Sequence, residues 1–308
     1  MDLSAISPTL LLASIMVTAT PILLAAIGEL VVERAGVLNL GVEGMMITGA
    51  IAGFIVAVHS QSPVLGFLGA ALGGAGLSLL FALLTQVLLS NQVATGLALT
   101  LAGLGLSSLL GQPYVGIRAP TLPALDIPLL ADIPILGPVL FQHDAMVYAG
   151  LLLCAGTWAF LRYARAGLIL RAVGENHDAA HALGYKVMRI RTLAILFGGA
   201  CAGLGGCYLS LVRVPQWTEG VTAGAGWIAL AIVVFASWRP GRLLVGAYLF
   251  GGIGALQLNL QAARAPIPVE LLSMAPYIVT ILTLVALSAG KGARGAPGSL
   301  GKPFHAST

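Results

Sequence analysis

Apolar runs of about 20 residues recur along almost the whole of this 308-residue chain, and each is long enough to cross the roughly 30 Å hydrocarbon core of a bilayer as a helix. Only 8% of the residues are charged, whereas a soluble domain carries about 25%. A backbone inside lipid must satisfy its own hydrogen bonds, so the runs indicate helices rather than open sheets. The sequence therefore predicts an all-α, polytopic membrane helix bundle and excludes a water-soluble fold.

The apolar runs divide at charged or Pro- and Gly-rich breaks into about nine predicted transmembrane helices. They cover residues 8–27, 36–58, 64–89, 92–110, 145–161, 192–212, 221–238, 243–260 and 271–289. These spans place residues 1–289 in one transmembrane domain, surrounded by membrane lipid. Residues 290–308 are rich in Gly, Pro and Lys, and we expect them to form a disordered cytoplasmic tail.

Basic residues set the predicted orientation, because the cytoplasmic loops of membrane proteins carry an excess of Lys and Arg. If the loop 162–191 is cytoplasmic, twelve of the 15 basic residues fall inside, and only Arg118, Arg213 and Arg264 fall outside. We therefore predict an outside N-terminus, an inside C-terminus and a proline-rich extracytoplasmic loop at residues 111–144. This distribution accounts for the net charge of +4, so we expect no nucleic-acid partner.

An unusual polar stretch, GELVVERAGVLNLGVEGMM at residues 28–46, surrounds the start of the second predicted span. Glu29, Glu33, Asn39 and Glu43 lie within it, and ionisable groups at membrane depth usually face a protein interior or a water-filled pathway. Three glycines among them predict a discontinuous helix near residues 36–58, a structure tolerated only in the protein interior or beside a cavity. Two interpretations stay open: a transport pathway, or structural hydrogen bonds.

A pair of histidines in the sequence His177-Asp-Ala-Ala-His181 is similar to the H-E-x-x-H pattern of zinc proteases. An intramembrane metalloprotease is therefore one hypothesis. The pattern requires a Glu as general base and a third ligand, whereas Asp178 is one carbon shorter and the surrounding loop is cationic. Two surface histidines on a short helix are the simpler interpretation, and we expect no metal site.

No phosphate-binding loop is present that would let this chain use ATP alone. Ahead of Gly301-Lys302, Ala296 stands where the first glycine is required, and Pro303 stands where Ser or Thr would bind magnesium. If ATP drives this protein, a partner must therefore bind it. An ion-coupled secondary transporter that uses Glu29 or Glu43 as a proton relay stays open as the alternative.

Residues 33–46, ERAGVLNLGVEGMM, and residues 171–184, RAVGENHDAAHALG, are the two most distinctive polar stretches. They resemble the N-terminal signature and the ATPase-engaging loop of the permeases of ABC importers for branched-chain amino acids, ribose-type sugars and nucleosides, above all the nucleoside type. The further stretches that agree are Asn91-Gln92 and residues 226–231, 235–240 and 255–261. The family loop commonly has Pro where His177 stands, so the histidine pair is incidental to coupling.

The resemblance implies a permease subunit of an ATP-driven importer in a bacterial inner membrane, which is not an enzyme and binds no cofactor. A separate ABC ATPase would hold ATP and Mg²⁺. A second permease, identical or different, would complete the pathway, and an extracytoplasmic substrate-binding protein would deliver the solute. The residues that match the coupling loop are Arg171, Gly174, Glu175, Asn176, Ala179, Ala180 and Gly184.

The resemblance also implies a nucleoside or a related sugar-like solute, whose hydroxyl groups and base need hydrogen bonds. Polar side chains on or beside the predicted spans are therefore the candidates for the pathway: Asn39, Glu43, Asn91, Gln92, Gln257 and Asn259. Each could equally join two helices through a hydrogen bond worth on the order of 1 kcal/mol.

Overall fold

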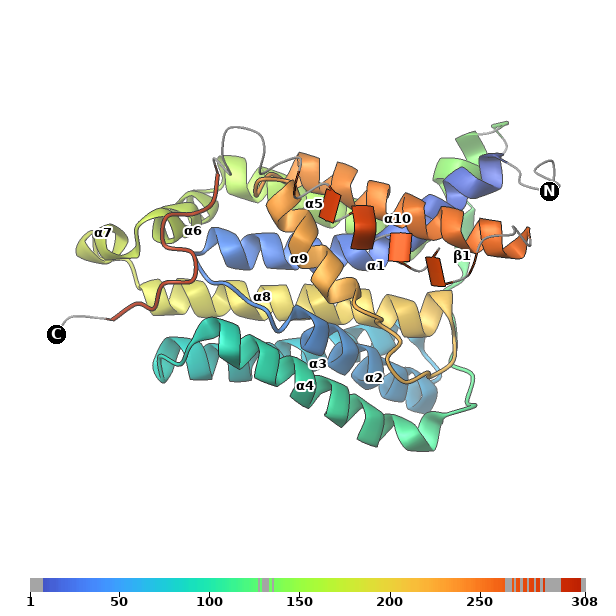
Figure 1. Cartoon of the computed structure of the whole chain (residues 1–308), viewed down its shortest axis with the longest axis horizontal. Coiled ribbons are helices and arrows are strands. Elements are labelled where there is room, and N and C mark those ends of the chain that lie inside the picture. Colours follow the sequence, from blue (N-terminus) through green and yellow to red (C-terminus); the bar gives the residue numbers. More distant parts are fainter. Residues whose placement is uncertain are drawn as a thin grey trace.

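The computed structural model describes residues 8–305, except 127, 129–132, 135, 264–267, 269, 272–273, 276, 280, 283–284 and 286–294. The chain forms an elongated bundle of helices (Figure 1). The described helices are α1 (Pro8–Arg34), α2 (Val42–Ser60), α3 (Pro63–Ala82), α4 (Gln92–Gly111), α5 (Ala145–Tyr163), α6 (Arg165–Glu175), α7 (His177–Ala182), α8 (Val187–Tyr208), α9 (Ala225–Phe235) and α10 (Pro240–Ala262). We call the end of the bundle that carries α6 and α7 the α7 end.

Seven of the described helices are long and apolar enough to cross a membrane: α1, α2, α3, α4, α5, α8 and α10. Single π-helical turns, Leu83–Val87 and Leu209–Arg213, extend α3 and α8. The prediction of about nine spans is not confirmed. The seventh predicted span, 221–238, contains α9, which has 11 residues and is too short to cross a bilayer at 1.5 Å per residue. The ninth, 271–289, falls mostly on residues outside the described part of the chain.

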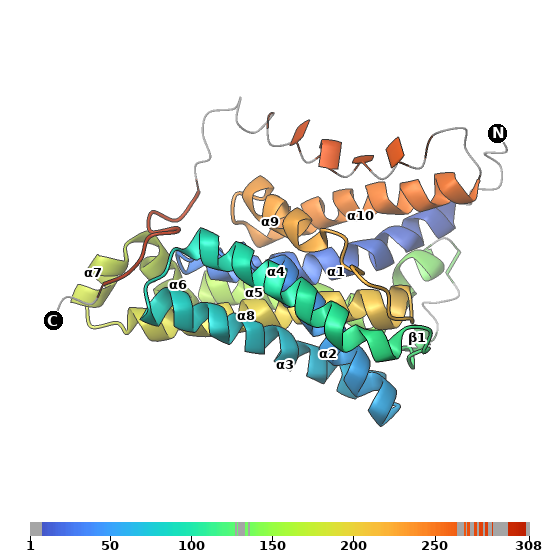
Figure 2. The same cartoon turned by 60° about the horizontal axis from the view of Figure 1, so that its bottom comes forward.

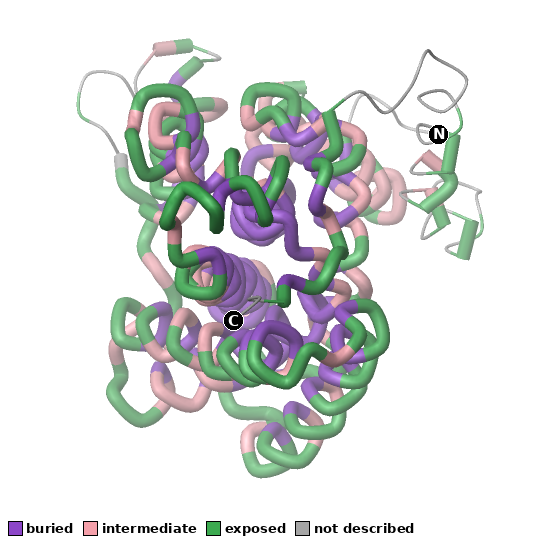
Figure 3. Tube along the Cα trace, turned by 90° about the vertical axis from the view of Figure 1, so that its left-hand side faces the viewer, coloured by how far each residue is buried: buried purple, intermediate pink, exposed green. Residues whose placement is uncertain are grey.

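Three helices form the centre of the bundle. These are α1, α2 and α8. In α2 and α8, 72% of the most apolar 18-residue stretch is buried inside the protein, against 28% in α5. Helix α1 packs on α8, α10, α9 and α5. Seen from the α7 end, buried residues occupy the middle of the bundle and exposed residues surround them (Figure 3). The outer surfaces of α3, α4, α5 and α10 therefore carry the exposed apolar side chains that suit a lipid environment.

Close approach of α2, α3 and α8 depends on glycine. A Cβ atom at Gly49 would lie 2.2 Å from the Cα of Gly203, and a Cβ atom at Gly203 would lie 2.2 Å from the carbonyl oxygen of Ala70. Small residues at such positions let helix backbones approach closely in lipid. These contacts hold α8 against both neighbours.

We expect Gly203→Ala to lower the free energy of unfolding by about 1–3 kcal/mol, because the added methyl group must displace backbone atoms. Gly76→Ala is the matched control on α3, since a Cβ atom there would meet nothing within 4 Å. Thermal unfolding of the detergent-purified variants measures both effects. Equal unfolding midpoints for the two variants would contradict this account of the packing.

The described residues of the loop 111–144 lie at the end of the bundle opposite α7 (Figure 1). The loop contains a short antiparallel pair, β1 (Ala124–Asp126) and β2 (Gln142–Asp144), in which Leu125 lies opposite His143. Isolated bridges join this loop to Gln216 and Trp217 in the loop before α9. The all-α prediction missed this pair because strands of three residues leave no periodic pattern in a proline-rich sequence.

The described C-terminal residues 295–305 are packed at the α7 end, beside α6 and α7 (Figures 1 and 2). Phe304 is 5% exposed and Ser299 is 4% exposed. The prediction of a disordered tail at 290–308 is therefore wrong for these residues. Their Gly- and Pro-rich composition indicated disorder, but the backbone groups of Ser299, Gly301 and Lys302 are hydrogen-bonded to the bundle.

Candidate functional site

The predicted span 36–58 begins as an irregular segment at residues 35–41, which enters the bundle between α1 and α2, whereas α2 itself is unbroken from Val42 to Ser60. Asn39 is fully buried within the irregular segment. Its Nδ2 and backbone N donate to the two carboxyl oxygens of Glu29, at 3.3 and 3.4 Å. The backbone N of Leu38 donates to Oε1 of Gln92 at 2.9 Å. Side chains from α1 and α4 thus satisfy a buried stretch of backbone that has no helical partners.

Glu43, in the first turn of α2, meets the beginning of α9. Its Oε1 accepts from Thr222 Oγ1 at 2.6 Å and from Gly224 N at 2.9 Å, and its Oε2 accepts from Gly226 N at 2.6 Å. The N-terminus of a helix has unpaired N–H groups and a dipole that favours a carboxylate. A Cβ atom at Gly226 would lie 2.6 Å from the Cα of Glu43, so only glycine permits this approach.

A third contact joins the end of α1 to the turn between α9 and α10. Glu33 Oε2 accepts from Trp238 Nε1 at 2.5 Å, and Nε and Nη2 of Arg34 donate to the Trp238 carbonyl at 3.0 and 2.7 Å. Ser237 and Trp238 have φ angles of 49° and 55°, which are costly for residues other than glycine. The carboxyl and guanidinium groups therefore stabilise a strained turn.

The three contacts bring together sequence motifs that lie far apart in the chain. Of the six pathway candidates, three belong to this buried network: Asn39, Glu43 and Gln92. Asn91 is exposed and caps α4 by accepting from Ala94 N at 3.0 Å. Gln257 and Asn259 are half-buried near the end of α10. Sequence reasoning singled out Glu29, the partner of Asn39, but not the partners of Glu43, which are Thr222, Gly224 and Gly226.

The predicted coupling loop folds into α6 and α7 at the α7 end. Asn176 accepts from Ala179 N at 3.0 Å and so caps α7, and Gly184, with a φ of 85°, follows its end. A Cβ atom at Gly174 would lie 2.0 Å from the Arg34 carbonyl oxygen, so α6 rests directly on the end of α1. Ala180 packs inward, whereas Ala179 is exposed.

Arg171 and Glu175, the charged members of the predicted coupling loop, line a pocket of about 320 Å³ with Arg34 and Pro297. The Nε atom of Arg171 is buried, and no described residue accepts a hydrogen bond from it. Glu175 is exposed. The pocket is therefore a recess beside α6 that three charged side chains line together with Leu168, Ala172 and Pro297.

Arg191, in the first turns of α8, is the central residue of the α7 end, and sequence reasoning did not single it out. Its side chain is fully buried and contacts three segments: Nε donates to the Ala35 carbonyl at 3.2 Å, Nη1 to the Lys302 carbonyl at 3.0 Å, and Nη2 to His177 Nδ1 at 3.0 Å. A guanidinium has enough donors in one plane for all three. Arg191 thus ties α7 to the irregular segment before α2.

Arg191 also defines the state of His177. Because Arg is only a donor, Nδ1 must accept, and the ring is neutral with its hydrogen on Nε2. Burial, and secondly the charge of Arg191, lower the pKa of His177, while Asp178 has the opposite effect. Among the described residues, no three His, Cys, Asp or Glu side chains converge on a metal position. The histidine pair therefore does not form the site that a zinc protease requires.

A larger cavity, of about 530 Å³, lies between α1, α5, α6 and α8. Its walls are apolar, with Val31, Phe160, Leu170 and Phe197 among the lining residues. A solute with many hydroxyl groups would lose its hydrogen bonds to water there. This cavity is therefore unsuited to a polar solute.

Seven long apolar helices in the described part of the chain, with an irregular segment at residues 35–41 and the short helix α9 among them, define a multi-pass membrane protein. Residues 11–286 match the family described as the permease component of the branched-chain amino acid transport system, and the chain belongs to this family. It is 42% identical to the protein named "Putative glucose ABC transporter permease protein TsgC13" of Haloferax volcanii, over 86% of this chain and 88% of that protein.

Two further relatives cover nearly the whole chain. NupQ of Bacillus subtilis, a guanosine ABC transporter permease, is 32% identical over 94% of each protein. NupC of Lactococcus lactis, a nucleoside ABC transporter permease, is 31% identical over 92% of this chain and 93% of that one. Among solved structures, an inward-facing ABC transporter of metal-chelate type shares the fold, with a TM-score of 0.52, 18% identity, and coverage of 90% of this chain and 84% of that one.

The chain is accordingly a permease subunit of an ABC transporter. It is the membrane component rather than an enzyme, ATP is hydrolysed on a separate ATPase subunit, and such permeases work with a substrate-binding protein. The family resemblance seen in the sequence is confirmed. Neither the ion-coupled carrier nor the metalloprotease agrees with this membership.

Proposed function

We infer that this permease imports a nucleoside or a related sugar-like solute, and that its ATPase docks on α6 and α7. Relatives named for guanosine, nucleosides and glucose support the solute class. The observation that carries the coupling role is the link through Arg191, which joins α7 to residues 35–41 and therefore to Asn39. Movement of α7 would reach the buried network through that link.

The distribution of basic residues supports a cytoplasmic α7 end. The exposed basic residues at that end are Arg162, Arg165, Lys186 and Arg189, and cytoplasmic loops carry an excess of such residues. The loop at 111–144 then faces outward, where a binding protein delivers the solute. The protein lies in the plasma membrane, which is the inner membrane in a bacterium that has two membranes.

The pathway lies between this chain and a second permease, identical or different. Within the described residues, the large cavity is apolar and the buried polar groups are mostly paired with one another. Three buried side-chain atoms have no described partner: Thr48 Oγ1, Gln92 Nε2 and Arg171 Nε. Of these, the amide Nε2 of Gln92 belongs to the side chain that contacts the irregular segment, through Leu38. That amide hydrogen is the best-placed donor for a passing hydroxyl group.

Proteoliposomes that contain this chain, its partner permease, the ATPase and the binding protein test the proposal. Labelled guanosine, uridine, glucose and leucine are supplied from the binding-protein side, with and without ATP. We expect ATP-dependent uptake of a nucleoside or of glucose. Uptake by the permeases alone under an ion gradient, or uptake of leucine only, would contradict the proposal.

Reversing one charge at the proposed docking site tests the location of the ATPase. In Glu175→Arg, a third cation would stand beside Arg34 and Arg171 in the pocket, and we expect co-purification of the ATPase to fall about tenfold or more. Glu219→Arg is the control, because Glu219 is exposed in the loop before α9, away from α7. The amount of the chain in the membrane should stay equal in both variants. Undiminished co-purification in Glu175→Arg would place the ATPase elsewhere.

A further inference from the structure

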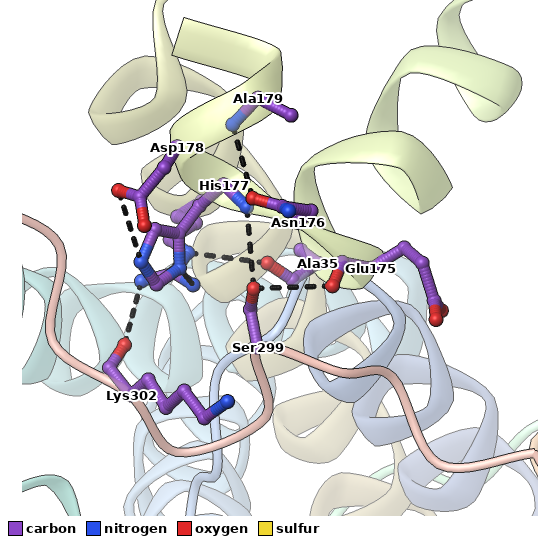
Figure 4. Close-up of polar contacts among 9 residues, drawn as sticks. Ala35, Glu175, Asn176, His177, Asp178, Ala179, Ser299 and Lys302 are labelled. Atoms are coloured by element: carbon purple, nitrogen blue, oxygen red, sulfur yellow. Dashed lines mark hydrogen bonds and ion pairs between the residues drawn. The ribbon is translucent and has the colours of Figure 1, made fainter.

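The C-terminal residues 295–305 are bound to the turn between α6 and α7 through Ser299. The backbone N of Ser299 donates to the Gly174 carbonyl at 2.9 Å. Its hydroxyl accepts from His177 N at 3.2 Å and donates to the Glu175 carbonyl at 3.3 Å (Figure 4). One residue therefore pairs with three backbone groups where α6 ends and α7 begins, groups that would otherwise lack partners.

Residues 301 and 302 of the same segment also contact the irregular segment 35–41 and helix α8. The backbone N of Gly301 donates to the Gly36 carbonyl at 3.2 Å, and the Lys302 carbonyl accepts from Arg191. Gly36 belongs to the irregular segment that leads to Asn39. Residues 299–302 thus bridge the α6–α7 turn and the segment before α2.

Phe304 fastens the end of this bridge to α7. Its ring makes edge contacts with His177 and His181, with centroids 5.4 and 5.2 Å apart. It belongs to a small apolar cluster of its own, with Val173 and Ala180 among the members. Because the cluster is separate from the main core, the position of α7 depends on this side chain.

The short length of α7 makes such support necessary. It has six residues, fewer than a helix needs to be stable without packing. Its outer side carries Leu183, which directly follows the helix and is 78% exposed, as a surface that receives a partner would. Without contacts on the side that faces the bundle, α7 would rotate when the ATPase pushes on it, and the other helices would not move.

We propose that residues 295–305 form a clasp that fixes α7 to residues 35–41, so that movement imposed on α7 by the ATPase is transmitted to the buried network instead of being lost. This inference rests on the proposed docking of the ATPase at α6 and α7. Ser299 and Phe304 are positioning residues of the clasp. Loss of the clasp separates ATP hydrolysis from transport and leaves ATPase binding intact.

The test is Phe304→Ala in the full-length chain, reconstituted with the partner permease, the ATPase and the binding protein. We expect the ATPase to co-purify and to hydrolyse ATP at close to the parent rate, while uptake of labelled guanosine or glucose per ATP hydrolysed falls about tenfold. Phe304→Leu should restore most of this ratio, because it keeps the apolar volume against Val173 and Ala180. His305→Ala is the control, since this neighbour is exposed and should leave the ratio unchanged.

Ser299→Ala provides a second variant, which removes one hydroxyl group and no apolar packing. We expect it to lower the same ratio of uptake to ATP hydrolysis. It decides the test if Phe304→Ala reduces the amount of chain in the membrane. An unchanged ratio in both variants would overturn the clasp, and so would loss of ATPase co-purification, because the segment would then be a docking surface. Failure of the parent chain to show ATP-dependent uptake would instead count against the proposed function, so the two failures are distinguishable.

Discussion

Glu43→Ala is expected to abolish transport and to destabilise the folded protein. The substitution would leave the donors of Thr222, Gly224 and Gly226 without their acceptor in the buried centre of the bundle. Each unsatisfied buried group costs about 1–3 kcal/mol, so the total loss is about 3 kcal/mol or more. The start of α9 would also lose the carboxyl group that fixes it against α2.

The amide variant Glu43→Gln refines this prediction. It keeps one accepting oxygen but turns an NH₂ group toward at least one of the three donors, so we expect an intermediate loss of stability and little transport. Glu219→Gln is the matched control, because Glu219 is exposed. Thermal unfolding in detergent and uptake in vesicles measure the outcome. Full transport by Glu43→Ala would show that α9 does not need this contact.

The sequence contained enough information to predict most of the bundle and part of its centre. Hydropathy located α1 to α5, α8 and α10, because each is a long apolar run between polar breaks. Glu29, Asn39 and Glu43 could be singled out because polar groups are costly at membrane depth. Hydropathy could not show that Glu43 faces α9, since the two are about 180 residues apart and no local pattern encodes their contact.

The half-helix α9 shows where hydropathy fails. Residues 221–238 have the composition of a full span, yet the helix begins only at Ala225 and ends at Phe235. The glycines before it allow the chain to turn inside the protein, and Glu43 replaces the hydrogen bonds that a longer helix would make. Composition reports how apolar a segment is, not how far it extends across the bilayer.

The α7 end was predictable only in outline. In the sequence Arg191 lies among basic residues that are exposed, and we counted it with them as a cytoplasmic cation. Nothing in that pattern indicated that its side chain is fully buried. Its three acceptors come from three distant segments, which no spacing rule connects. Phe304 was the one signal that the Gly- and Pro-rich tail is packed, because a large aromatic residue is unusual in a disordered segment.

Arg191→Lys is expected to lower both the stability of the folded protein and transport. An ammonium group is a compact charge without the planar fork of a guanidinium, so it cannot reach Ala35, His177 and Lys302 together. Losing two hydrogen bonds from a charged group, at about 1.5–3 kcal/mol each, lowers stability by about 3 kcal/mol or more. Transport should fall by about tenfold or more, because the link from α7 to residues 35–41 is lost.

Arg189→Lys is the control for this substitution, because Arg189 is also on α8 but is exposed. The measurements are ATP hydrolysis, uptake and thermal unfolding of the reconstituted complex. If Arg191 links α7 to residues 35–41, Arg191→Lys must lower uptake more than it lowers hydrolysis, because the ATPase still docks while its movement is no longer transmitted. An equal fall in both activities would mean that Arg191 only supports the fold. The route from α7 to Asn39 would then run through residues 299–302, which join His177 to Gly36, or through the direct contact of Gly174 with the Arg34 carbonyl.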